Sequence, residues 1–167
     1  MTKVIVLLTL LSGIFQGSLA MISVKKGPFS KGTDDALSKV KCPDGFVGVK
    51  CECKPIHLCD GSYFKDVVTC HAHKRGVMSS LFIKAVVTCK NDVDIIAQVK
   101  SPGFTKGPSA KCPSDTKPVS CSVHSPWANS LAGPNGMYLK TTISGQKCSA
   151  PNGCSKCQVQ IICKAKG

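Results

Sequence analysis

Twelve cysteines in a chain of 167 residues constrain what this sequence can fold into more than any other feature. Six of them lie between residues 42 and 89, and the other six lie between residues 112 and 163. An even number of cysteines in an exported chain is typical of a disulfide framework, whereas cytosolic proteins keep their thiols reduced. The sequence therefore predicts two cysteine-rich segments held by disulfide bonds, with no free thiol required.

The first twenty residues are predicted to be a secretory signal peptide. Lys3 gives a short basic start, residues 4–11 form a nearly unbroken apolar run, and Ser18 and Ala20 are small residues suited to signal-peptidase cleavage. The apolar run is too short to span a bilayer. We therefore expect a mature chain that begins at Met21 and is secreted into the extracellular space, with no transmembrane segment after the signal is removed.

The two cysteine-rich segments also begin and end alike. The first opens with KCPDGFVGVKC at Lys41 and the second with KCPSDTKPVSC at Lys111, so eight residues separate the first two cysteines of each. Each closes in a β-branched run followed by Cys-Lys, at residues 89–90 and 163–164. Similarity of this kind indicates a repeated structural unit.

Short runs rich in Val, Ile and Thr, separated by Gly, Pro and Asn, predict β-strands and turns. The fold class expected is all-β, built from two tandem small disulfide-stapled antiparallel β modules. The strongest helix candidate is the short segment from Asp34 to Val40. Strands are expected at 67–69, 81–88, 95–99, 138–143 and 158–162. The predicted division is a flexible basic arm (21–41), a first module (42–89), a linker with a possible edge strand (90–111) and a second module (112–167).

The segment Cys70-His71-Ala72-His73, with the strand-like run that leads to Cys89, carries a resemblance to a known family. It resembles a module of the Cys/His-rich C-terminal domain of the subtilisin/kexin-type proprotein convertase that regulates the LDL receptor. The second cysteine-rich segment is similar in its cysteine spacing. This chain departs from the family in ending each module with Cys-Lys instead of Cys-Cys, and in having no protease domain. The resemblance implies small antiparallel β modules used for contacts with other proteins, and it implies no chemistry.

The resemblance also implies a disulfide pairing. The outer bridges would be Cys42–Cys89 and Cys112–Cys163, and the inner bridges would be Cys51–Cys70 and Cys121–Cys148. The remaining four cysteines would pair locally, as Cys53–Cys59 and Cys154–Cys157, or would cross between the modules. Each outer bridge closes a loop of about 50 residues, which is worth on the order of 4 kcal/mol in the chain-entropy model. Because modules of this size bury little surface, the bridges are predicted to be necessary for folding.

The charge of the chain indicates an anionic partner. The formal net charge is +13, and without Lys3 the mature chain has 21 basic and 9 acidic side chains, a net of +12. Arg75 is the only arginine, and no basic stripe alternates with aromatic residues, so nucleic-acid binding is disfavoured. We expect an extracellular protein or an anionic surface, such as a glycan, a lipid headgroup or an acidic protein. The predicted binding residues are Trp127, Lys74 and Arg75, although Trp127 is equally suited to the core of its module.

Histidines and one CxxC pair are the candidates for metal ligands. His71 and His73 are two residues apart, so on a strand they share a face and are placed to hold a metal or to fix local structure, the role that the resemblance favours. The single CxxC at 154–157 has no matching second pair, which a structural zinc site requires. His57 and His124 have no visible partner, and Tyr63-Phe64 is expected in the core. We therefore predict no metal site and no cofactor.

No arrangement in the sequence supports catalysis. The second module has a single acidic residue, Asp115, whereas a glycosidase-type site needs two carboxylates. No nucleophile-elbow sequence is present. The predicted function is therefore a secreted, non-catalytic extracellular binding module. The alternatives are a structural component of an extracellular matrix and an exported toxin or antimicrobial effector.

Overall fold

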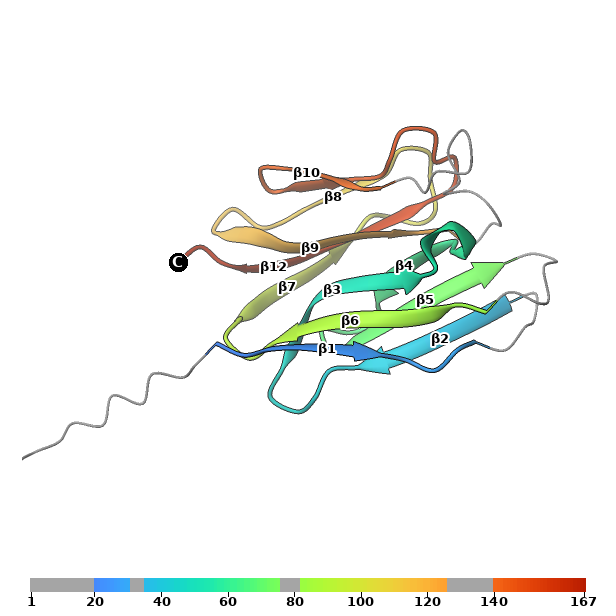
Figure 1. The fold of residues 1–167 in the computed structure, drawn as a ribbon. Coiled ribbons are helices and arrows are strands. Elements are labelled where there is room, and N and C mark those ends of the chain that lie inside the picture. The colour runs from blue at the N-terminus through green and yellow to red at the C-terminus, as the bar shows by residue number, and fades with distance from the viewer. Residues whose placement is uncertain (1–19, 31–34, 76–81, 126–139) are drawn as a thin grey trace, which may run out of the picture.

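A computed structural model describes residues 20–30, 35–75, 82–125 and 140–167 of the chain. The predicted signal peptide up to residue 19, and Trp127, lie outside the described residues. Within these ranges the fold is all-β and antiparallel, as expected, with one 3-10 turn, η1 (Ile56–Leu58), beside the strands (Figure 1). None of the helices in the described part is long and apolar enough to cross a membrane.

Within the described ranges, each half of the chain contributes six strands in the same arrangement. In the first half the strands are hydrogen-bonded in the orders β1-β6-β3 and β2-β5-β4, and in the second half in the matching orders β7-β12-β9 and β8-β11-β10. The strands of the first half are β1 (Ile22–Lys26), β2 (Asp35–Lys41), β3 (Val47–Lys54), β4 (Gly61–Phe64), β5 (Thr69–Arg75) and β6 (Lys84–Lys90). Those of the second half are β7 (Ile95–Lys100), β8 (Ser109–Lys111), β9 (Thr116–His124), β10 (Thr142–Ser144), β11 (Lys147–Ser149) and β12 (Gln158–Ala165).

The two halves match down to single hydrogen bonds, so we call them repeat 1 (22–90) and repeat 2 (95–165). The backbone N–H of Cys42 donates to the carbonyl of Val68 at 2.9 Å, and that of Cys112 donates to Gln146 at the same distance. Further matched pairs are Phe46 to Pro43 with Thr116 to Pro113, and Gly27 to Ala85 with Ser101 to Val159. The repeat predicted from the sequence is therefore a repeat of structure.

All twelve cysteines are paired, and every bridge stays within one repeat. The outer and inner bridges are those predicted, and the last four cysteines pair locally. The bonds are Cys42–Cys89, Cys51–Cys70, Cys53–Cys59, Cys112–Cys163, Cys121–Cys148 and Cys154–Cys157. The cysteines lie in two buried clusters, one for each repeat, packed with Phe64, Ile83 and Val87 in the first and Val123, Val159 and Ile161 in the second.

Each repeat begins well before its first cysteine, which corrects the predicted boundaries. The segment 21–41, predicted as a flexible arm, supplies β1 along β6 and β2 along β5. The segment 90–111, predicted as a linker, supplies the equivalent strands β7 and β8, and β7 is the expected edge strand. The predicted helix at Asp34–Val40 is wrong: Ala36 and Ser38 are buried while Leu37 and Lys39 are exposed, which is the two-residue period of a half-buried strand.

One sheet passes from repeat 1 into repeat 2. Strand β4 meets β9 where Gly61 lies opposite His124, which joins the strands in the order β2-β5-β4-β9-β12-β7 (Figure 1). Gly61 has a φ of +136°, and a Cβ atom at this position would lie 2.5 Å from the Cα of His124. Only glycine therefore permits the close approach that fastens the two repeats together.

Candidate binding cleft between the two repeats

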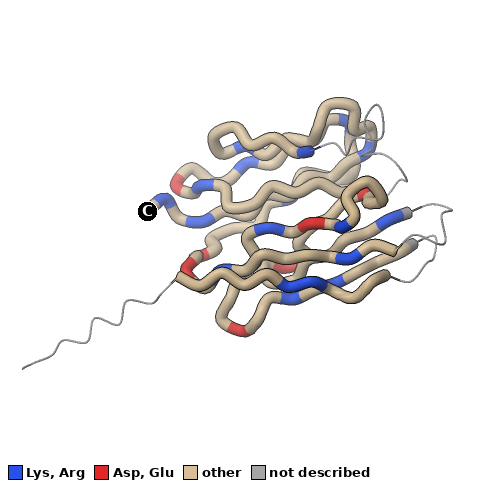
Figure 2. Tube along the Cα trace, in the orientation of Figure 1, with Lys and Arg blue, Asp and Glu red and all other residues tan. Residues whose placement is uncertain are grey.

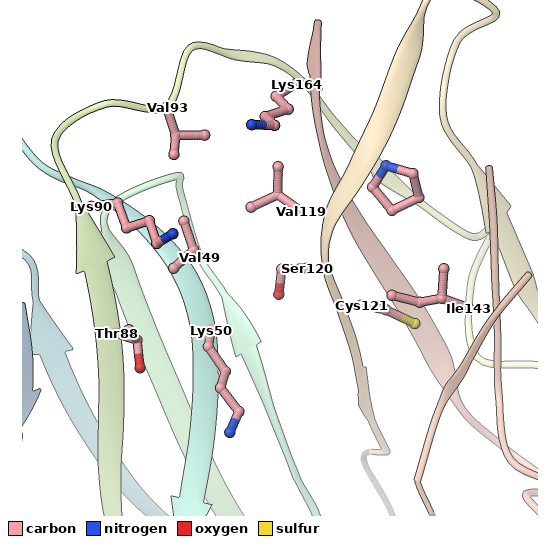
Figure 3. Close-up of a pocket in the computed structure, with 11 residues that line it drawn as sticks. Val49, Lys50, Thr88, Lys90, Val93, Val119, Ser120, Cys121, Ile143 and Lys164 are labelled. Atoms are coloured by element: carbon pink, nitrogen blue, oxygen red, sulfur yellow. The ribbon is translucent and has the colours of Figure 1, made fainter. Parts of the chain in front are cut away.

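A cleft of about 550 Å³ lies where β3 and β6 of repeat 1 face β9 and β12 of repeat 2 (Figure 3). Its wall is largely apolar and includes Val49, Val93, Val119 and Ile143. Three lysines, Lys50, Lys90 and Lys164, also line it. A concave apolar surface with a few converging polar groups is the usual form of a ligand site.

Equivalent residues of the two repeats face each other in this cleft. The ladder of β3 with β6 skips Val49, and the ladder of β9 with β12 skips Val119, so each valine is a β-bulge residue. Both valines point into the cleft (Figure 3). Lys90 and Lys164 each follow the closing cysteine of their repeat, and they too line the cleft. Contact between like positions is the pattern of an interface related by two-fold symmetry.

The ammonium groups of Lys90 and Lys164 point into the cleft from opposite sides, whereas Lys50 extends toward one end (Figure 3). The Lys50 side chain pairs with Glu52 at 3.0 Å. Within the described ranges neither Lys90 nor Lys164 forms an ion pair, and no described acidic residue lines this cleft. The cleft is therefore a site of positive potential, although lysines are also spread over the rest of the molecule (Figure 2).

A second groove of about 280 Å³ continues from the cleft and shares Lys50 and Cys121 with it. It lies between β3 of repeat 1 and the start of β10 in repeat 2, where Lys140 and Thr141 form its far side. The two repeats are therefore fastened by backbone pairing on one side of their interface and are open on the other.

The two sides differ at one equivalent position. The Ser62 hydroxyl donates to the carbonyl of Cys51 at 2.9 Å, and the Thr141 hydroxyl donates to the carbonyl of Cys121 at 3.2 Å. Ser62 and Thr141 are therefore equivalent positions of the two repeats, and so are the residues that precede them in the chain. In repeat 1 that residue is Gly61, and in repeat 2 it is Lys140. A side chain at Gly61 would meet the backbone of His124, whereas Lys140 lines the open groove.

Histidine and aromatic rings gather on the far face of the shared sheet, next to Gly61. The rings of Tyr63 and His124 stack with centroids 4.2 Å apart, and the Tyr63 hydroxyl lies 3.3 Å from Nδ1 of His71. The His124 ring also contacts His73 and Phe104, with centroids 6.2 Å and 5.2 Å away. His71 and His73 thus share a face as predicted, whereas the position of His124, on β9, beside them was not predicted from the sequence.

Burial dominates the protonation of this cluster. It lowers the pKa of His124 to about 3, with the positive charges of His73 and Lys100 acting in the same direction. Burial also lowers the pKa of His71 and raises that of Tyr63. In the described part of the chain, no group of three or more His, Cys, Asp or Glu side chains is placed to hold a metal ion.

The other predicted site residues lie apart from the cleft. Lys74, predicted as a binding residue, is buried on β5 with 7% of its surface exposed. Arg75 ends the same strand. Phe64 is fully buried as predicted, whereas Tyr63 is half-buried outside the core. His57 is exposed on η1.

Lys90 and Lys164 were not predicted from the sequence to line a site, although the signal was present. Both repeats end in Cys-Lys, at residues 89–90 and 163–164. Comparison of this chain with models of known protein families and with curated proteins found no match. The resemblance to the convertase modules therefore stays a prediction.

Proposed function

We propose that this protein is a secreted, non-catalytic binding protein that recognises an anionic extracellular partner through the cleft between its repeats. The observation that carries the proposal is the pair of lysines, Lys90 and Lys164, that converge on an apolar cleft with no acidic residue among its described lining. A small all-β fold with six disulfides supports the extracellular setting, because disulfides persist in oxidising compartments.

The position of these lysines also supports specificity for the cleft. Charges on an open surface are screened by salt over roughly 8 Å at physiological ionic strength. Ammonium groups in a recess with apolar walls lie in a lower dielectric, where their attraction for an anion is stronger. We therefore expect the cleft lysines to contribute more to binding than lysines elsewhere, even though the net charge of the chain is high.

The test compares two double variants with the same change in charge. Lys90→Glu/Lys164→Glu changes the cleft, and Lys106→Glu/Lys111→Glu changes two exposed lysines elsewhere. Retention of each protein would be measured on three anionic supports, heparin, phosphatidylserine vesicles and a polyglutamate resin, as a function of salt. We expect the wild-type protein to bind at least one support in a salt-dependent way, and the cleft variant to elute at much lower salt than the control variant. Equal losses in both variants, or no retention of the wild-type protein, would contradict the proposal.

A further inference from the structure

We infer that the occupant of the cleft is an amphipathic organic anion, in which an apolar body carries one anionic head group. This inference rests on the proposed function, because it names the chemical class of the partner that the same cleft takes. Three properties of the cleft support it: the chemistry of its walls, the placement of its lysines and its size.

The walls suit an apolar body. Val49 and Val119 enter from the two β-bulges, and Val93 and Ile143 extend the same surface. No aromatic ring is among the described lining residues, so the cleft offers no stacking platform for a nucleobase. Ser120 and Thr88 are the hydroxyl-bearing lining residues, which is few for a ligand covered in hydroxyl groups.

The lysines suit a single head group. Lys90 and Lys164 come from equivalent positions and point into the same space (Figure 3). Lys50 is balanced by Glu52, which lies 3.0 Å away. Two compact ammonium groups without a fixed planar geometry bind a carboxylate or a sulfate by charge and do not require a bidentate partner.

The size suits a small molecule. The volume of about 550 Å³ lies within the range of roughly 300–1,000 Å³ that is usual for small-molecule sites. A ligand in this position contacts both repeats at once, because Val49 and Lys90 belong to repeat 1 and Val119 and Lys164 to repeat 2. Binding should therefore raise the melting temperature of the protein as ligand concentration increases.

The test uses decanoate as the probe and two control compounds, each of which lacks one of the two parts of decanoate. Acetate has the head group without the body, and 1-decanol has the body without the charge. Isothermal titration calorimetry should show binding of decanoate, with acetate and 1-decanol each at least tenfold weaker. Methyl NMR spectra should show shifts for valines at 49, 93 and 119 on addition of decanoate.

Matched variants separate the two parts of the site. Lys90→Gln/Lys164→Gln should lower the affinity for decanoate at least tenfold, whereas Lys106→Gln/Lys111→Gln should leave that affinity unchanged. Val93→Thr keeps the shape of the side chain and replaces a methyl group with a hydroxyl. It should therefore lower the affinity for decanoate severalfold and leave the affinity for acetate unchanged. Circular dichroism and melting of each variant without ligand show whether it is folded.

Three results would overturn the inference. Equal affinity for decanoate and acetate would mean that charge alone acts, and an acidic peptide that binds in the cleft while decanoate does not would assign the site to a protein partner. Decanoate could also fail to bind while the protein is still retained on an anionic support in a way that depends on salt and on the cleft lysines. That result would contradict the inference and leave the proposed function standing. Loss of that retention as well would remove both.

Discussion

At the scale of single residues, the side chain of Gln160 hydrogen-bonds to the backbone of Phe64 as a neighbouring strand would. Its side chain is 2% exposed, its Oε1 accepts from the N–H of Phe64 at 2.7 Å, and its Nε2 donates to the carbonyl of Phe64 at 2.6 Å. The side-chain amide thus satisfies both backbone groups of Phe64, a residue of β4 beyond the point where that strand pairs with β9. In repeat 1 the equivalent position is Val86: its carbonyl oxygen lies 3.5 Å from the Sγ of Cys70, as that of Gln160 lies 3.7 Å from the Sγ of Cys148. Gln160 is therefore specific to the contact between repeats.

Gln160→Leu should destabilise the protein by about 2–5 kcal/mol, because it leaves a buried donor unpaired and weakens the pairing of a buried acceptor. The carbonyl of Phe64 keeps one bond, from Gln98 at 2.9 Å. Chemical denaturation of the folded, oxidised protein measures the change. Gln158→Leu is the control, since Gln158 is only half-buried and makes one longer bond of 3.3 Å. Similar losses in the two variants would show that Gln160 does not fasten the repeats.

His124 should make the protein less stable in acid. The pKa of His124 is about 3 in the folded protein, against about 6.5 in an unfolded chain, so the unfolded state binds more protons between these values. The free energy of unfolding should therefore fall as pH decreases from about 6.5 to about 3, by up to about 1.4 kcal/mol per pH unit. The positive charges of His73 and Lys100 lower the pKa of His124 further, and the ring of Tyr63, which stacks on His124, is uncharged at these pH values.

Denaturation curves at pH 7 and pH 4.5 measure this effect. His124→Gln should reduce the difference in stability between the two pH values, whereas His57→Gln, at an exposed position on η1, should leave it unchanged. A wild-type protein that is equally stable at both pH values would contradict the prediction.

At the scale of elements, the strands that were found from the sequence are those with a run of β-branched residues. Strands β6, β7 and β12 have such runs, and each was expected within a few residues of its bounds. Strands β3 and β9 were missed because lysine, cysteine and, in β9, Pro118 interrupt the apolar pattern. Pro118 is tolerated because it lies next to the bulge at Val119. These missed strands form much of the cleft, so the cleft was not predictable either.

Gly61→Ala should weaken the junction of β4 with β9 by roughly 1–3 kcal/mol, because φ is positive at this position and the new Cβ would meet the backbone of His124. Thermal melting of the oxidised protein measures the loss. Lys140→Ala, at the equivalent position of the exposed open side, should change the stability by no more than about 0.5 kcal/mol. If Gly61→Ala has the same melting temperature as the wild-type protein, the junction of β4 with β9 does not depend on glycine.

At the scale of the whole molecule, the sequence predicted the duplication and the disulfide bonds but not where each repeat begins. Matching cysteine spacings show the duplication directly. The strands β1, β2, β7 and β8 come before the first cysteine of their repeat. The segments that contain them have many lysines and several glycines, and this composition suggested an arm and a linker. The convergence of Lys90 and Lys164 depends on how the repeats pack, and no pattern along a single chain reports that packing.

A fragment spanning 94–167 should fold alone under oxidising conditions, whereas one spanning 112–167 should not. The longer fragment keeps β7, which pairs with β12, and β8, which pairs with β11. The shorter fragment lacks β7 and β8, so β12 and β11 each lose one of their two neighbouring strands, and the side of the core that Ala97 and Val99 cover is exposed. Circular dichroism and mapping of the disulfides after oxidative refolding distinguish the two outcomes. Native pairing in the shorter fragment would show that the repeat does begin at its first cysteine.

The connection between the repeats is short: β6 ends at Lys90 and β7 begins at Ile95. Two separate chains that shared a cleft of this kind would part as their concentration fell, and each would carry away half of the site. Here the two halves are tied by a few residues, so each remains at a high effective concentration around the other. Dilution, however great, leaves the cleft assembled, and its affinity for a ligand does not depend on how much of the protein is present.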